Sequence, residues 1–100
     1  MKPDQYHLCK IAEECTKVAQ RAIKAQQFGL GEVQQGQDKD NLARLMDEFH
    51  DLFTTMENFC NLVGRDPIPD EVKKGTRLRK MDKFLQLSKD LNQVDETTFI

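Results

Sequence analysis

Apolar residues recur every three or four positions along the first part of the chain, which is the spacing of one face of an α-helix. The series runs Leu8, Ile11, Cys15, Val18, Ala22 and Ala25. Pro3 and Asp4 suit a first helical turn, because proline needs no backbone partner there and an acid favours the positive end of the helix dipole. Gly29 supplies a C-terminal cap. The pattern therefore predicts a helix over residues 4–28.

A second apolar series with the same spacing follows a glycine-containing segment. Residues 29–40 hold three glycines among polar side chains, which predicts a mobile loop. Asn41 is in place to cap the next helix, and Gly64 is in place to end it. The pattern predicts a helix over residues 41–63, with the apolar positions Leu42, Leu45, Met46, Phe49, Leu52, Phe53, Met56, Phe59, Cys60 and Val63.

Two prolines, Pro67 and Pro69, interrupt the chain after the second predicted helix, because proline removes a backbone donor and forces the preceding residue out of the helical region. Asp70 then begins a third helix over residues 70–91, with the apolar positions Val72, Leu78, Met81, Phe84 and Leu85. Residues 92–100 show no period and are expected to be a flexible tail.

The fold class predicted from these patterns is all-α: a helical hairpin plus a third helix, in a single domain spanning residues 1–100. Only 38% of the residues are hydrophobic, so a chain of this length has little core to enclose a pocket by itself. The apolar stripes of the first two helices are too wide for one partner. We therefore expect copies to assemble into a four-helix-bundle oligomer that completes any active site.

Several classes of protein are excluded at this stage. No segment approaches the roughly 18 consecutive apolar residues of a membrane helix, and the first five residues lack the apolar region of a signal peptide. We expect no membrane association. Cys9, Cys15 and Cys60 show no CxxC spacing, which predicts reduced, mostly buried thiols in a cytoplasmic protein.

Charge is divided unevenly along the chain. Residues 1–64 carry 7 Lys and Arg against 10 Asp and Glu, whereas residues 73–83 hold six basic side chains and one acid. A basic helix can contact nucleic-acid phosphates without reading sequence. Because the net charge is −2 and no aromatic residues alternate with these bases, nucleic acid is not the partner that we expect.

Acidic residues on the first two predicted helices are spaced to share a face. Glu48 and Asp51 lie three apart on one helix, and Glu13 and Glu14 lie on the other. If the helices pack by their apolar seams, these carboxylates converge. Converging carboxylates repel one another unless a cation such as Mg²⁺, which prefers oxygen ligands and phosphates, lies between them. The alternative is an exposed acidic surface. One stripe of the first helix also carries Glu14, Lys17, Arg21 and Lys24.

The ordered set of motifs resembles the MazG-like nucleoside triphosphate pyrophosphohydrolases. Residues 11–29, IAEECTKVAQRAIKAQQFG, are similar to the family's first motif helix, which carries EExxE, a nearby basic residue and a phenylalanine-glycine end. Residues 48–51, EFHD, match its ExxD motif. Residues 79–88, RKMDKFLQLS, are similar to its lysine-rich C-terminal helix. The resemblance covers roughly residues 8–90, and the small size resembles a phage-type or stand-alone member.

The resemblance implies Mg²⁺-dependent hydrolysis of a nucleoside or deoxynucleoside triphosphate between the α and β phosphates, with Mn²⁺ as a substitute ion. The products would be the nucleoside monophosphate and pyrophosphate. It also implies a homodimer or homotetramer. Carried over by position, the catalytic residues are Glu13 and Glu14, the metal ligands are Glu14, Glu48 and Asp51, and the substrate-binding residues are Lys17, Lys24, Lys80 and Lys83.

One position departs from the family pattern. Lys17 stands where EExxE has its third glutamate, and a protonated lysine cannot ligate a metal ion. In one interpretation, Glu14, Glu48 and Asp51 suffice for the metal, and Lys17 binds a substrate phosphate. In the other, the metal site is impaired, and the chain is a helical nucleotide-binding or protein-interaction module.

Overall fold

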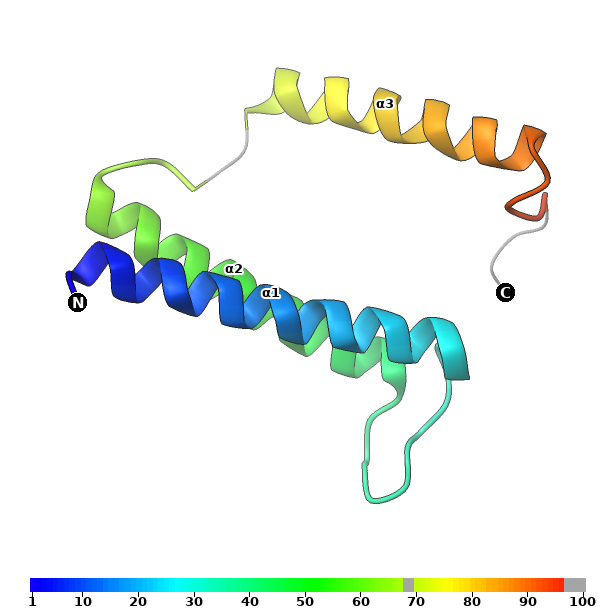
Figure 1. The fold of residues 1–100 in the computed structure, drawn as a ribbon, viewed down its shortest axis with the longest axis horizontal. Coiled ribbons are helices and arrows are strands. Elements are labelled where there is room, and N and C mark those ends of the chain that lie inside the picture. The colour runs from blue at the N-terminus through cyan, green and yellow to red at the C-terminus, as the bar shows by residue number, and fades with distance from the viewer. Residues whose placement is uncertain (68–69, 97–100) are drawn as a thin grey trace. The chain divides into compact units, whose positions relative to one another are not determined.

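Three α-helices make up the protein in a computed structural model that describes residues 1–67 and 70–96 (Figure 1). They are α1 (Pro3–Phe28), α2 (Asn41–Val63) and α3 (Glu71–Asp90), and no strand occurs among the described residues. The all-α prediction is confirmed, and each predicted helix bound lies within one residue of the observed one. Pro69 and the last four residues of the predicted tail lie outside the described residues.

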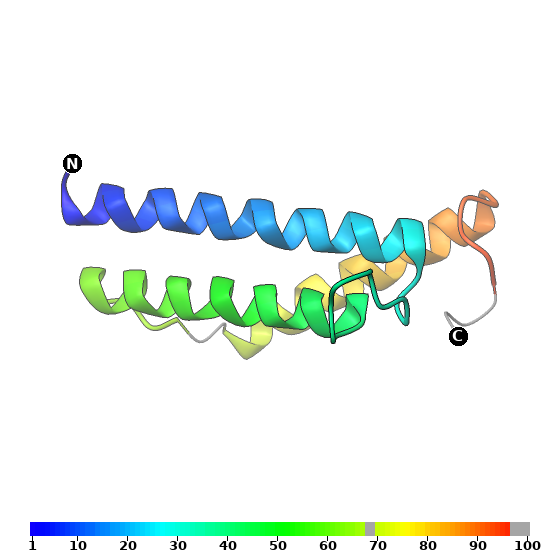
Figure 2. The ribbon, with the colours of Figure 1, turned by 90° about the horizontal axis from the view of Figure 1, so that it is seen from below.

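The chain divides into two compact units, residues 1–67 and residues 68–100, which are described separately. The first unit is an antiparallel hairpin in which α1 and α2 lie side by side over most of their length (Figure 2). Antiparallel packing places the middle of α1 beside the middle of α2. Acidic residues from the two helices can therefore meet across the hairpin.

Both helix ends that border the connecting loop are capped, the first by a backbone hydrogen bond and the second by a side chain. At the end of α1, Gly29 has a φ of 96°, which favours glycine, and its N–H donates to the carbonyl oxygen of Ala25. At the start of α2, the side chain of Asp40 accepts a hydrogen bond of 2.8 Å from the N–H of Ala43. Asp40 is therefore the N-cap, and the prediction that Asn41 caps this helix is wrong.

Asn41 instead fastens the loop to α2. Its side chain is buried, and its Nδ2 donates to the carbonyl oxygen of Gly29 at 2.8 Å and to Oε1 of Glu32 at 3.3 Å. Its backbone N–H donates to the carbonyl oxygen of Glu32 at 3.0 Å, and the N–H of Leu42 donates to that of Leu30 at 3.0 Å. The loop that composition predicts to be mobile is thus hydrogen-bonded to the first turn of α2.

Apolar burial within the hairpin is small. Ala25 is the only apolar residue that the structure buries among the described positions. One stripe of α2, formed by Leu45, Leu52 and Phe59, is half-buried against α1. A second stripe with the same spacing is exposed and consists of Leu42, Met46, Phe49, Phe53 and Met56.

The cysteines are free thiols, as predicted, but they are not mostly buried. Cys9 and Cys15 are exposed and Cys60 is half-buried. The wide apolar stripe of α1 exceeds what the single contact with α2 can cover, so the sequence pattern overstated the burial of Cys15.

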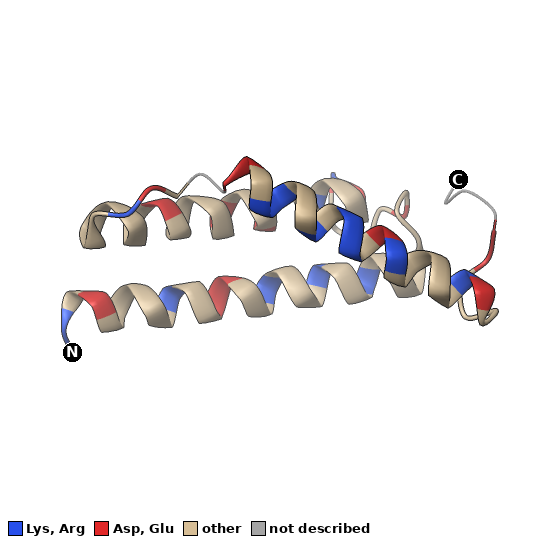
Figure 3. Cartoon of the chain, turned by 90° about the horizontal axis from the view of Figure 1, so that it is seen from above, with Lys and Arg blue, Asp and Glu red and all other residues tan. Residues whose placement is uncertain are grey.

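The second unit contains α3. Asp70 is its N-cap, because its Oδ1 accepts hydrogen bonds from the N–H groups of Val72 at 2.9 Å and Lys73 at 3.0 Å. Basic residues follow one another closely along this helix (Figure 3). Its large apolar side chains are exposed as well, namely Val72, Leu78, Met81, Phe84, Leu85 and Leu87.

Candidate metal centre

Three carboxylates from the two hairpin helices meet in one place. Glu14 lies midway along α1, and Glu48 and Asp51 lie about one turn apart on α2. One carboxylate oxygen from each residue lies within 4.8 Å of the other two. The structure therefore brings together all three residues that the family resemblance implies as metal ligands.

Burial makes this cluster different from an ordinary acidic surface. The side chain of Glu14 is only 13% exposed, Glu48 is half-buried and Asp51 is exposed. Two oxygens, Oε2 of Glu14 and Oε2 of Glu48, are buried without a hydrogen-bond partner among the described residues. A buried polar atom without a partner costs about 1–3 kcal/mol, and more when it is charged. Both oxygens are suitable ligands for a hard divalent cation.

Lys17 is the basic side chain closest to the cluster. Its Nζ lies 3.3 Å from Oε1 of Glu14 and 3.8 Å from Oε1 of Glu13. The hydrogen bond and charge of Glu14 raise the pKa of Lys17 above its ordinary value, and the charges of Glu13 and Glu48 act in the same direction. Lys17 is therefore a cation at neutral pH. It neutralises part of the cluster's negative charge.

Glu13 is not part of the cluster. Its Oε2 lies 3.1 Å from Nζ of Lys10, and its side chain is exposed. The hydrogen bond from Lys10 is the main reason that the pKa of Glu13 lies below its ordinary value of 4.5, with the charges of Lys10 and Lys17 adding to the effect. Glu13 and Glu14 are adjacent on a helix, so their side chains project about 100° apart. The structure therefore separates the two residues that the family resemblance pairs.

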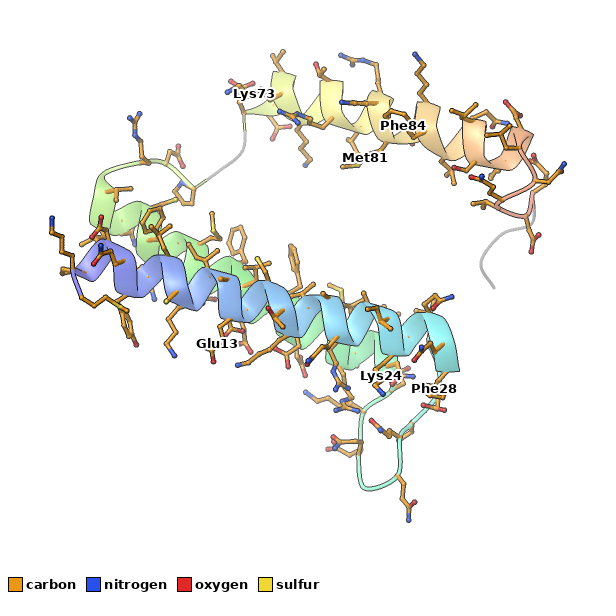
Figure 4. The ribbon with its side chains drawn as sticks, in the orientation of Figure 1. Glu13, Lys24, Phe28, Lys73, Met81 and Phe84 are labelled. Atoms are coloured by element: carbon orange, nitrogen blue, oxygen red, sulfur yellow. The ribbon has the colours of Figure 1, made fainter. Side chains whose placement is uncertain are left out.

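The remaining predicted substrate residues do not all come together. Nζ of Lys24 lies over the ring of Phe28, 5.5 Å from its centroid, near the loop end of α1 (Figure 4). Lys80 and Lys83 belong to α3 in the second unit, where Nζ of Lys80 lies 6.0 Å from the ring centroid of Phe84.

Two features near the loop end of the hairpin were not nominated from sequence. Nη1 of Arg21 is buried without a hydrogen-bond partner among the described residues. The only sequence signal for it was its place in the stripe with Glu14, Lys17 and Lys24. A shallow hollow of about 200 Å³ also opens here, lined by Phe28, Glu32, Val33, Gln34 and Gln35. The hollow depends on how the loop folds, and nothing in the sequence pattern indicates it.

Comparison with known proteins adds no family assignment. No family model matches the sequence, and no curated protein or solved structure matches it. Within the described part of the chain, no helix combines the length and apolar character needed to span a membrane.

Proposed function

We propose that the protein is a Mg²⁺-dependent hydrolase that cleaves a nucleoside or deoxynucleoside triphosphate between the α and β phosphates. The observation that carries the proposal is the convergence of Glu14, Glu48 and Asp51, with two buried oxygens that lack hydrogen-bond partners among the described residues. The motif order along the chain supports the same reaction. A bare acidic surface would not explain why one carboxylate oxygen of Glu14 and one of Glu48 are buried.

In this proposal the three carboxylates hold the cation and Lys17 contacts a substrate phosphate. A bound Mg²⁺ supplies neutralisation of phosphate charge and an acidified water. Of the two catalytic residues that the resemblance implies, Glu14 is the better placed to act as a general base, because it belongs to the cluster. Glu13 is held by Lys10 on the exposed side of α1, and we assign it the lesser role of holding Lys17 in position.

A substrate panel tests the proposal. The purified chain is incubated with Mg²⁺ or Mn²⁺ and each common ribo- and deoxyribonucleoside triphosphate, and monophosphate and pyrophosphate are measured. We expect both products in equal amounts from at least one substrate, and loss of turnover in Glu48→Gln. Absence of monophosphate from every triphosphate with both ions would overturn the proposal.

The second candidate is a catalytically impaired module that binds nucleotides or proteins. The contact of 3.3 Å between Lys17 and Glu14 favours it, because this ammonium competes with a divalent cation for the same carboxylate. Lys17→Glu separates the two candidates. Activity that appears or rises in this variant indicates an impaired site, whereas a fall in activity indicates that Lys17 serves a phosphate.

We also propose that the active protein is a homodimer or homotetramer. The exposed stripe of α2 carries the argument, since Phe49 and Phe53 are 49% and 42% exposed within a hairpin that buries almost no apolar side chain. Pairing of two such stripes would give a four-helix bundle. The same pairing would cover the large apolar area that a separate hairpin leaves in water.

A further inference from the structure

A strip of basic side chains extends from the acidic cluster toward the loop end of the hairpin. We define this cationic strip as Lys17, Arg21 and Lys24 of α1 with Arg44 of α2. The three α1 residues follow Glu14 by three, seven and ten positions, so they share its face of the helix. Arg44 precedes Glu48 by four positions on α2. Because the helices are antiparallel, both displacements lead toward the loop (Figure 2).

Three of the four cations have no acidic partner within residues 1–67 and 70–96. Among the described residues, neither Arg21, Lys24 nor Arg44 lies within 4.0 Å of a carboxylate oxygen. Lys24 faces the ring of Phe28, and Nη1 of Arg44 donates to the neutral amide oxygen of Gln34 at 2.7 Å. The surface beside the three carboxylates therefore carries positive charge that no neighbouring carboxylate neutralises among the described residues.

Arg21 is the member of the strip with an unmet requirement. Its side chain is half-buried, and within the part of the chain that the structure describes, Nη1 is buried without an acceptor. An arginine that served only to solvate the surface would keep its guanidinium in water. A buried N–H group of a charged side chain needs an acceptor, and the planar guanidinium matches the paired oxygens of a phosphate.

We propose that the cationic strip binds the phosphate chain of the substrate, with the guanidinium of Arg21 as its central contact. The identity of the ligand rests on the proposed function, because the strip adjoins the carboxylates that would hold the cation. Lys17 and Lys24 are separated by seven residues, or about 10 Å along the helix axis. That length suits a chain of several phosphates better than a single phosphate ion.

Inorganic tripolyphosphate, titrated calorimetrically into the full chain in EDTA and low salt, is the direct probe. We expect the unmodified protein to bind it and Arg21→Gln to bind it about tenfold more weakly, because a hydrogen bond to a charged group is lost. The matched control is Arg65→Gln. Arg65 follows the opposite end of α2 from the loop, so its variant is expected to keep the original affinity.

Two further arms keep the result interpretable. Arg21→Lys retains the positive charge but not the planar arrangement of N–H donors. It is expected to bind tripolyphosphate with an affinity between those of the unmodified protein and Arg21→Gln. If Arg21→Gln loses its helical circular dichroism, the comparison of Arg21→Lys with Arg65→Lys decides. A single-stranded oligonucleotide, titrated in parallel, distinguishes a nucleic-acid backbone from a free phosphate chain. It is expected to bind more weakly per phosphate than tripolyphosphate.

The proposal is overturned if tripolyphosphate does not bind, if the Arg21 and Arg65 variants lose affinity equally, or if the oligonucleotide binds more tightly per phosphate. Because the titration contains no divalent cation, its outcome does not depend on metal binding or turnover. Binding through Arg21 with no hydrolysis in the substrate panel would retain this inference and reject the proposed hydrolase. Hydrolysis in the substrate panel, together with unchanged tripolyphosphate binding in Arg21→Gln, would retain the proposed hydrolase and reject this inference.

Discussion

At the scale of single residues, the contact between Lys17 and Glu14 has the largest effect on the charge of the acidic cluster. The side chain of Glu14 is mostly buried, with one oxygen 3.3 Å from Nζ of Lys17 and the other without a partner among the residues that the structure describes. The ammonium of Lys17 pairs with one oxygen of this carboxylate. In the proposed metal centre, the other oxygen is available to a cation. Lys17 itself is 45% exposed, so water screens its charge, and in the proposed metal centre we expect it to weaken cation binding without abolishing it.

Replacing Lys17 tests this balance. In Lys17→Met, one positive charge beside the three carboxylates is removed, so we expect Mn²⁺ to bind roughly two- to fivefold more tightly, which is the range of an exposed ion pair. Calorimetric titration of the metal alone measures the change. Lys10→Met is the matched control, because Lys10 pairs with Glu13, outside the cluster. Unchanged or weaker Mn²⁺ binding in Lys17→Met would contradict the assigned competition.

At the scale of the elements, the hairpin depends on the junction between the connecting loop and the start of α2. α2 begins with an Asp40 cap and a buried Asn41 whose side chain reaches the last carbonyl of the α1 end at Gly29. These bonds fix where α2 starts relative to α1. They therefore help to set the register that brings Glu48 and Asp51 opposite Glu14.

Asn41→Ala tests this junction. The variant loses the hydrogen bonds that the buried Asn41 side chain donates to the carbonyl oxygen of Gly29 and to Glu32. We expect it to lower the free energy of unfolding by about 1–3 kcal/mol. Urea denaturation followed by circular dichroism measures the loss. Asn58→Ala, at an exposed position of the same helix, is the control and is expected to change stability by less than about 0.5 kcal/mol. Equal effects of the two variants would mean that the junction contributes nothing specific.

At the scale of the whole molecule, the main feature is the exposed apolar surface of the hairpin. A single copy buries Ala25 and leaves most of its large apolar side chains at least partly in water. An isolated hairpin of this kind gains little from the hydrophobic effect. A second copy offers the same stripe, with the same spacing of three and four, and pairing two identical stripes is geometrically self-consistent.

Phe53→Asp tests self-association through the exposed stripe. Light scattering on a sizing column is expected to give a multiple of 11.6 kDa for the unmodified chain and the mass of one copy for the variant, since a carboxylate in the paired interface would be desolvated. Turnover is expected to fall with the loss of assembly. The control is Val33→Asp, which places the same change on an exposed loop residue. A monomeric unmodified protein, or a Phe53→Asp variant that still assembles, would reject this interface.

Much of the fold follows from the sequence by itself. Helical spacing, together with glycine and proline at the boundaries, sets three helices to within one residue, because these are local preferences of the backbone. The acidic positions that could meet were also readable, since residues three and four apart share a helix face. Local patterns did not predict three features. Asp40 rather than Asn41 caps α2, the loop is hydrogen-bonded to the first turn of α2, and Glu13 lies outside the acidic cluster.

The tertiary structure decided which side chains share a site. Register between α1 and α2 is set by contacts distant in sequence, and it selects Glu14, Glu48 and Asp51 while leaving Glu13 with Lys10. It also leaves Nη1 of Arg21 buried and without a hydrogen-bond partner in the described part of the chain, which no spacing rule indicates. The sequence alone determined the helices and the pool of charged residues on their faces. Only packing determined which of these charges are enclosed, because enclosure depends on the neighbouring helix.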